Sequence, residues 1–109
     1  MIKVASFLSR TLTSSEKTVL ELILKNEVSI VPLKKGSTNL RNRRSDDIVQ
    51  RIPFDCDVVI IKTHGCIARE ISELTNLTIV QYRYVSDEQF HKVFKPWHVF
   101  RNGGAVLSF

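Results

Sequence analysis

The sequence predicts an α/β domain whose three-layer, mostly parallel sheet carries a C-terminal β-hairpin at one edge. Strand-like and helix-like patterns alternate along the chain, which is typical of parallel sheets with helices on both faces. The run Val58 to Ile61 is β-branched throughout and predicts a central strand buried on both sides. Asn102-Gly103 favours a type I′ turn between two final strands. The expected order is β-α-β-α-β-α-β-α, followed by the hairpin.

Four strands are expected before the hairpin, over residues 2–8, 28–33, 57–62 and 77–84. In the first strand, Ile2 and Val4 are apolar and alternate with other residues, so they should face inward. Pro32 has no backbone N–H to donate, and it therefore predicts the end or edge of the second strand.

The first two helices are predicted from their N-terminal residues. Thr13-x-x-Glu16 fits a capping box, so a helix should begin near Ser14, and Asn26 can end it. Ser45 precedes two acids, which predicts that its hydroxyl caps a short helix ending before Pro53.

Two further helices are predicted from apolar spacing. Residues 66–75 carry Ile67, Ile71 and Leu74 at helical intervals, so these three should form the buried stripe. Ser86 should cap a fourth helix that carries Phe90, and the chain then enters the hairpin.

The hairpin should comprise residues 97–101 and 104–109. It ends in Leu107, Ser108 and Phe109. Such an apolar end needs cover, either from the core or from a second copy of the chain, because an exposed strand edge can pair with another strand. We therefore consider a homo-oligomer formed through the hairpin.

Length and composition restrict the class of protein. The chain has 109 residues, which is the size of a single small domain, 1–109. No run of 18 apolar residues is present, so no membrane partner is expected. The first 30 residues do not resemble a signal peptide, and two cysteines are too few for a disulfide framework. These features favour a cytoplasmic, intracellular protein.

The positive charge is concentrated in one segment. The formal net charge is +5, and residues 34–44 contain five basic side chains and no acidic one. The segment is also rich in Gly, Ser, Thr and Asn, so it should form a basic surface loop. Three arginines within four positions can contact phosphate oxygens through their planar guanidinium groups. A solvated loop that only aids solubility is the simpler alternative.

The expected topology gathers polar residues at one edge of the sheet. Ligands of open α/β sheets bind outside the carboxyl ends of the parallel strands, where helix N-termini add free N–H groups. Donors and cations follow three of the predicted strands. The predicted phosphate-binding residues are Arg10, Lys34, Lys35, Arg41, Arg43, Arg44, Lys62 and His64.

Aromatic residues that could stack on unpaired bases are Tyr82, Tyr84 and Trp97. For Trp97, covering the edge of the core is the more ordinary role. Tyr82 and Tyr84 lie on one face of a predicted strand and should be packed or half-exposed together.

Evidence for catalysis is weak. His64 follows the buried strand and could act as a general base, with Lys62 and Cys66 beside it in the sequence. The cysteines and histidines match no zinc-ligand spacing. The glycine-rich phosphate motifs of dinucleotide-binding and P-loop proteins are absent, so no cofactor is expected.

The sequence therefore favours a small, basic, non-enzymatic protein that binds nucleic acid. A flexible multi-arginine segment suits an extended polyanion, and RNA or single strands are favoured. One alternative is a protein-interaction or inhibitor module whose basic loop docks on an acidic protein surface. A less favoured alternative is a small enzyme acting on a phosphorylated ligand.

Overall fold

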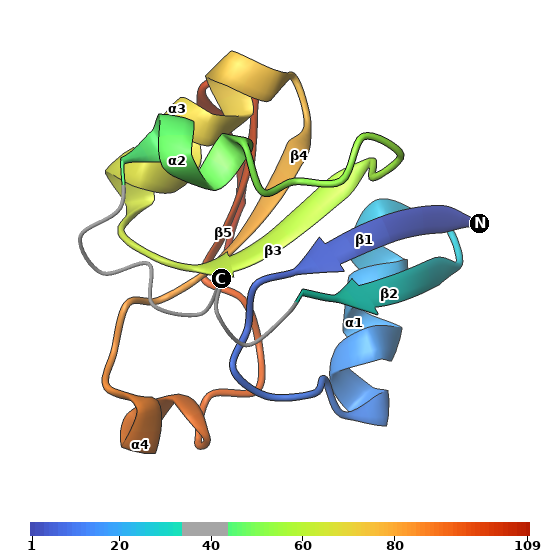
Figure 1. Cartoon of the computed structure of the whole chain (residues 1–109). Coiled ribbons are helices and arrows are strands. Elements are labelled where there is room, and N and C mark those ends of the chain that lie inside the picture. The colour runs from blue at the N-terminus through green and yellow to red at the C-terminus, as the bar shows by residue number, and fades with distance from the viewer. Residues whose placement is uncertain (34–43) are drawn as a thin grey trace.

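The computed structural model describes residues 1–33 and 44–109 (Figure 1). Helices alternate with strands until the fourth helix, after which two strands follow directly. The elements are β1 (Ile2–Ser6), α1 (Ser14–Leu24), β2 (Val28–Pro32), α2 (Ser45–Val49), β3 (Val58–Lys62), α3 (Gly65–Thr75), β4 (Thr78–Tyr82), α4 (Asp87–Phe90), β5 (His98–Arg101) and β6 (Gly104–Ser108).

The six strands form one mixed sheet in the order β2-β1-β3-β4-β5-β6. The first four strands in this order run parallel, whereas β5 pairs antiparallel with β4 and β6 pairs antiparallel with β5. The prediction of a mostly parallel sheet is therefore wrong, although the α/β class is confirmed. As predicted, β3 lies inside the sheet, and Val58 to Ile61 are all buried.

The change of direction has a local cause. A parallel connection must carry the chain back across the sheet, usually through a helix of several turns. The four residues of α4 are too few for that return, and α4 lies beyond the carboxyl ends of the parallel strands (Figure 1). The Trp97 amide donates to the Gln81 carbonyl at 2.9 Å, so β5 begins beside the end of β4. Its only available direction is antiparallel.

The start of α1 confirms the capping box. The Thr13 hydroxyl accepts a hydrogen bond from the Glu16 amide at 3.2 Å, and the Glu16 carboxylate accepts one from the Thr13 amide at 3.0 Å. The helix ends one residue earlier than Asn26 predicts. Lys25 adopts the left-handed conformation at φ 55°, and its amide donates to the Glu21 carbonyl.

Two details of the other helices correct the predictions. Ser45 is the first residue of α2 rather than its cap, because Arg44 holds the extended cap position. Leu74 of α3 is exposed, whereas Ala68 and Ser72 are buried beside Ile71. The buried stripe of α3 is therefore rotated toward small residues, which allow the helix to approach the sheet closely.

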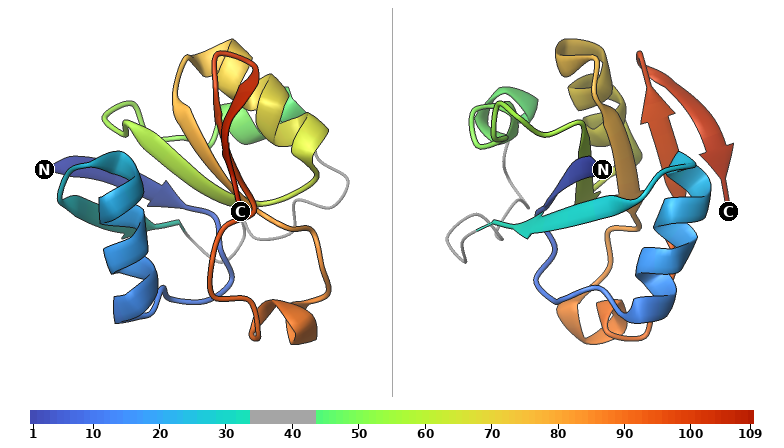
Figure 2. Two further views of the ribbon diagram at one scale, coloured as in Figure 1. Left: turned by 180° about the vertical axis from the view of Figure 1, so that it is seen from behind. Right: turned by 90° about the vertical axis from the view of Figure 1, so that its right-hand side faces the viewer.

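Hydrophobic residues form two clusters, and successive strand residues point alternately to one and the other. One cluster includes Ile48 of α2 and Ile71 of α3. The other includes Leu20 of α1 and Phe90, the last residue of α4. Figure 2 shows the helices disposed around the sheet from two further directions. The three-layer arrangement itself stays a prediction.

The C-terminal hairpin is present with the predicted turn. Asn102 and Gly103 have φ values of 51° and 80°, as a type I′ turn requires. All five residues of β6 are exposed, so this outer strand contributes little to the core. Within residues 1–33 and 44–109, no helix combines the length and the apolar character needed to cross a bilayer.

Candidate nucleic-acid interface

The carboxyl ends of β1 to β4 lie along one edge of the sheet because these four strands are parallel. Arg10 follows β1, Lys62 ends β3, and His64 begins the connection to α3. The structure therefore places three of the predicted phosphate-binding residues at the predicted edge.

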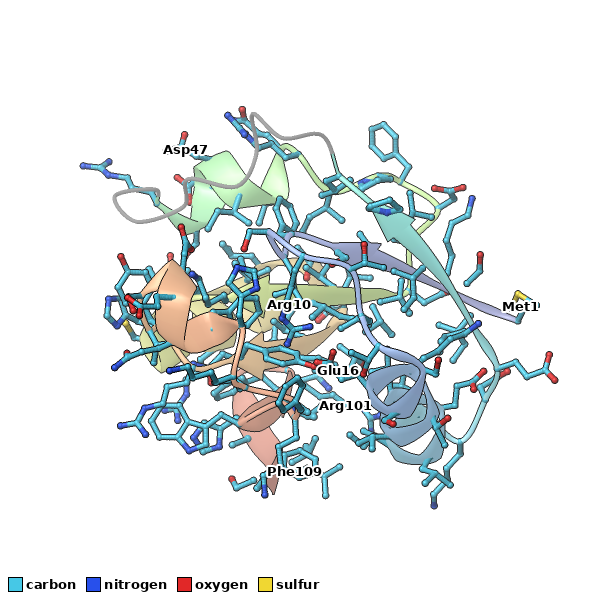
Figure 3. All side chains as sticks on the ribbon, turned by 90° about the horizontal axis from the view of Figure 1, so that it is seen from below. Met1, Arg10, Glu16, Asp47, Arg101 and Phe109 are labelled. Atoms are coloured by element: carbon cyan, nitrogen blue, oxygen red, sulfur yellow. The ribbon has the colours of Figure 1, made fainter. Side chains whose placement is uncertain are left out.

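Arg10 is held by a buried carboxylate. Its Nη1 and Nη2 atoms donate to Glu16 Oε1 and Oε2 at 2.7 and 3.0 Å, in a two-point ion pair. Tyr82 Oη donates to the same carboxylate at 2.8 Å, and Arg10 Nη2 also contacts the Val93 carbonyl. Figure 3 shows the Arg10 and Glu16 side chains close to each other. The cluster ties α1, β4 and the chain after α4 together.

The protonation states follow from this geometry. Burial alone would raise the pKa of Glu16, but hydrogen bonds from Arg10, Thr13 and Tyr82 outweigh it, and the pKa lies below its ordinary value. For Tyr82, burial raises the pKa, and the neighbouring Glu16 carboxylate raises it further. Glu16 is therefore ionised and Tyr82 is neutral at pH 7.

Lys62 and Arg10 both contact the ring of Phe90. Lys62 Nζ is 4.9 Å from the ring centroid, and the guanidinium carbon of Arg10 is 4.6 Å from it. Lys62 Nζ also pairs with Asp87 Oδ1 at 2.7 Å, and this pair lowers the pKa of Asp87. A phosphate arriving here would compete with Asp87 for Lys62 and with Glu16 for Arg10.

His64 is exposed and packs against Tyr84 in a tilted arrangement, with 4.5 Å between the ring centroids. It occupies the cap position of α3, but its side chain makes no capping hydrogen bond. Cys66 lies in the first turn of the same helix and is exposed. Within the described residues, no group of three or more His, Cys, Asp or Glu side chains is placed to hold a metal ion.

The other two aromatic candidates differ in accessibility. Tyr82 is 3% exposed and cannot stack on a base. Trp97 is 38% exposed, but its ring is already in contact with two neighbours. It stacks on the His98 ring, with 4.7 Å between centroids, and the guanidinium carbon of Arg83 lies 4.7 Å from its centroid. Tyr84 is half-buried and contacts His64, so it is the aromatic candidate that lies beside a predicted phosphate-binding residue.

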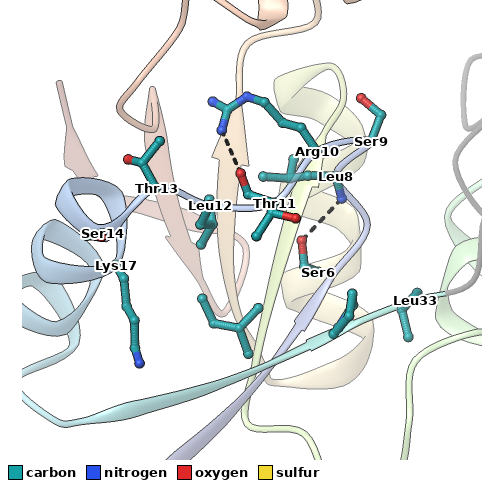
Figure 4. A pocket seen from close by; sticks show the side chains of 12 residues that line it. Ser6, Leu8, Ser9, Arg10, Thr11, Leu12, Thr13, Ser14, Lys17 and Leu33 are labelled. Carbon is teal, nitrogen blue, oxygen red and sulfur yellow. Dashed lines mark hydrogen bonds between the residues drawn. The ribbon is translucent and has the colours of Figure 1, made fainter.

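A cleft of about 560 Å³ opens between the β1–α1 connection and the end of β2 (Figure 4). Leu8, Leu12, Ile30, Pro32 and Leu33 supply its apolar surface. Hydroxyl and basic side chains supply the rest: Ser6, Ser9, Arg10, Thr11, Thr13, Ser14 and Lys17. None of the described residues that line it is acidic.

The basic segment adjoins this cleft in the sequence. The Leu33 amide donates to the Ser6 carbonyl at 3.0 Å, which fixes the chain at the cleft wall just before Lys34. Lys34, Lys35, Arg41 and Arg43 lie outside the described residues. Arg44 is exposed and caps α2 through its backbone.

Two structural features of this edge were not predicted from the sequence. Glu16 was assigned a capping role only, yet its carboxylate also binds Arg10 and Tyr82. A buried carboxylate at a helix start needs a cation, and Arg10 is close in sequence, so this pairing had a detectable signal. The cleft had no such signal, because it depends on how α1 and the end of β2 are placed.

Comparison of the chain with models of protein families, with curated proteins and with solved structures gave no match.

Proposed function

We propose that this protein binds nucleic acid, with single-stranded RNA favoured, through the basic segment 34–44 and the adjoining carboxyl edge of the sheet. The observation that carries the proposal is the charge distribution. Five cations without an acid follow directly from Leu33, which is fixed in the wall of an acid-free cleft.

The surroundings of the cleft support the same ligand class. Glu16 is the nearest acid in the β1–α1 region, and Arg10 neutralises it in a buried pair. Lys17 lies exposed on the cleft side of α1. Positive charge at the cleft would attract a polyanion and raise its association rate, which supports the proposal.

The test is the salt dependence of binding to a single-stranded oligouridylate. Arg41→Gln, Arg43→Gln and Arg44→Gln, combined in one variant, should weaken binding. The slope of log Kobs against log salt should fall by about 2, because three phosphate contacts are lost. Fluorescence anisotropy at several ionic strengths measures both quantities.

A matched control removes three cations from the opposite edge of the sheet. Lys3, Lys25 and Arg101 lie at the amino ends of β1 and β2 and at the end of β5. Their combined substitution by Gln makes the same change in net charge and should leave the slope unchanged. Equal effects of the two variants would contradict a localised site. Binding of a protein that survives nuclease treatment, without oligonucleotide binding, would favour docking on an acidic protein surface instead.

A further inference from the structure

We infer that the cleft beside β2 receives one nucleotide unit of the bound strand, with the base against its apolar wall and the phosphate toward Lys17. This inference rests on the proposed function and adds a specific subsite to it. The cleft combines two chemistries that a nucleotide also combines: an apolar surface and a polar margin with positive charge.

The residues of the apolar wall are anchored in the hydrophobic core. Leu12 and Ile30 are half-buried and pack against the core cluster on the α1 side of the sheet. Leu33 packs against the other cluster, which includes Ile48 of α2. These anchored side chains offer a rigid surface, and a preformed surface reduces the ordering cost of binding a flat base.

The polar margin comes from a single connection and the helix that it enters. Ser9, Thr11 and Ser14 are exposed at the cleft and carry hydroxyl groups that can donate to phosphate or ribose oxygens. The Ser6 and Thr13 hydroxyls already accept hydrogen bonds from the amides of nearby residues, which fixes the connection. Lys17 adds an exposed ammonium one turn into the helix.

Size and charge select a nucleotide over other amphipathic ligands. A volume of about 560 Å³ suits a small molecule or one unit of a polymer, because pockets for such ligands occupy roughly 300–1,000 Å³. Arg10 and Lys17 line the cleft, and no acidic side chain is among its lining residues. Because Arg10 is already paired with Glu16, Lys17 is the lining cation offered to the phosphate. The adjoining segment adds five cations and no acid, which favours an anionic ligand that continues outside the cleft.

A second groove of the described structure differs from the cleft in its charge. The groove between α3 and β5 has a similar volume, about 550 Å³. However, Glu70 and Glu73 line it together with Arg69, and the Arg69 guanidinium lies over the Phe100 ring at 5.8 Å. Two carboxylates at its wall disfavour phosphate, so the second groove serves as an internal comparison.

The experiment follows backbone amide NMR signals during titration with uridine 5′-monophosphate, uridine and ribose 5-phosphate. The monophosphate should shift the signals of residues 9–14 and 30–33 and should bind more tightly than either fragment. Lys17→Glu should weaken the binding of the monophosphate by about tenfold, because a charged hydrogen bond is lost. Ile30→Thr keeps a β-branched residue in the strand. It should weaken the binding of the monophosphate and of uridine by about fivefold but leave the binding of ribose 5-phosphate unchanged.

Lys25→Glu is the control, since it makes the same charge change at the other end of α1 and should leave nucleotide binding unchanged. If an oligouridylate binds through the basic segment while the monophosphate shifts no signal in these ranges, the subsite is overturned and the proposed function stands. If the monophosphate binds in the cleft while the oligouridylate does not bind, the proposed function fails and the cleft is a site for free nucleotides. Shifts centred on the groove beside α3 would also overturn the inference.

Discussion

Among the described side chains at the carboxyl edge, that of Glu16 makes four specific hydrogen bonds. Its carboxylate accepts hydrogen bonds from the Thr13 amide, both terminal nitrogens of Arg10, and the Tyr82 hydroxyl. Its side chain is fully buried, whereas that of Arg10 retains 12% exposure. Burying a charge is costly, and several good partners are needed to offset the loss of water. Glu16 is therefore essential to the stability of this edge.

We expect Glu16→Gln to lower the free energy of unfolding at pH 7 by about 3 kcal/mol, because it leaves the Arg10 charge largely buried without its partner. The pKa of Glu16 is lowered in the fold, so its stabilising effect is complete above the ordinary value of 4.5 and is lost as pH falls through the folded pKa. The difference between wild type and variant should therefore shrink in acid. Urea denaturation between pH 3 and 7 measures it.

Asp87→Asn provides the control for this prediction. Asp87 also pairs with a cation, Lys62, but its side chain is 81% exposed, and solvent screens such pairs. Its replacement should change stability little at any pH. A loss as large as that of Glu16→Gln, or a Glu16→Gln effect that does not depend on pH, would show that the buried pair is not the cause.

At the scale of elements, the sequence was most informative where the signal is local. The capping box at Thr13 and the Asn102-Gly103 turn depend on neighbours within a few residues, and both are confirmed. The β-branched run of β3 predicted its place because its composition suits only a buried strand. Ser45 misled because a hydroxyl before acids is equally compatible with the first helical position. The direction of β5 depends on where α4 packs, and the position of α4 cannot be predicted from a local sequence pattern.

The hairpin turn should depend on Gly103 and not on Gly104. Gly103 has φ of 80°, a conformation that costs a residue with a Cβ atom roughly 1–2 kcal/mol. Its amide also donates to the Ser72 hydroxyl at 3.0 Å, which attaches the turn to α3. Gly103→Ala should therefore destabilise the protein by about that amount and speed amide exchange in β5 and β6. Hydrogen exchange followed by NMR measures the second effect.

Gly104→Ala is the matched control at the next position. Gly104 does not adopt a positive φ, and an added Cβ would lie 3.7 Å from the Arg101 carbonyl oxygen, an ordinary contact. This substitution should be neutral or slightly stabilising, because Gly in a strand costs conformational entropy. Equal destabilisation by the two substitutions would argue against a turn-specific role for Gly103.

At the scale of the whole molecule, the excess positive charge belongs to one segment, residues 34–44, and the rest of the chain has no net charge. Outside residues 34–44, the eleven basic and eleven acidic side chains balance. The sequence located this excess of charge because charge needs no fold to be counted. It also placed Arg10, Lys62 and His64 at the carboxyl edge, where the structure has them, because the parallel direction of the first four strands was enough for that. It did not predict two ion pairs at that edge. The pairing of Arg10 with Glu16 had a local signal that was missed, whereas Lys62 and Asp87 are 25 positions apart in the sequence.

This concentration of charge predicts that a bound polyanion raises the melting temperature of the protein. A segment of like charges repels itself, and a bound polyanion relieves that repulsion in the folded protein. A ligand at 100 times its dissociation constant stabilises by about 2.7 kcal/mol, which for a domain of this size raises Tm by roughly 10 °C. We expect a single-stranded oligouridylate to produce this increase in the wild-type protein at low salt, measured by differential scanning calorimetry.

The two charge variants decide whether the basic segment causes the increase. The protein with Arg41, Arg43 and Arg44 replaced by Gln should lose most of the increase at the same ligand concentration. The protein with Lys3, Lys25 and Arg101 replaced should retain it, because those cations lie at the opposite edge of the sheet. Raising the salt concentration should abolish the increase in the wild type, since counterion release weakens as salt rises. An increase that survives both the Arg substitutions and high salt would mean that the ligand binds elsewhere and without phosphate contacts.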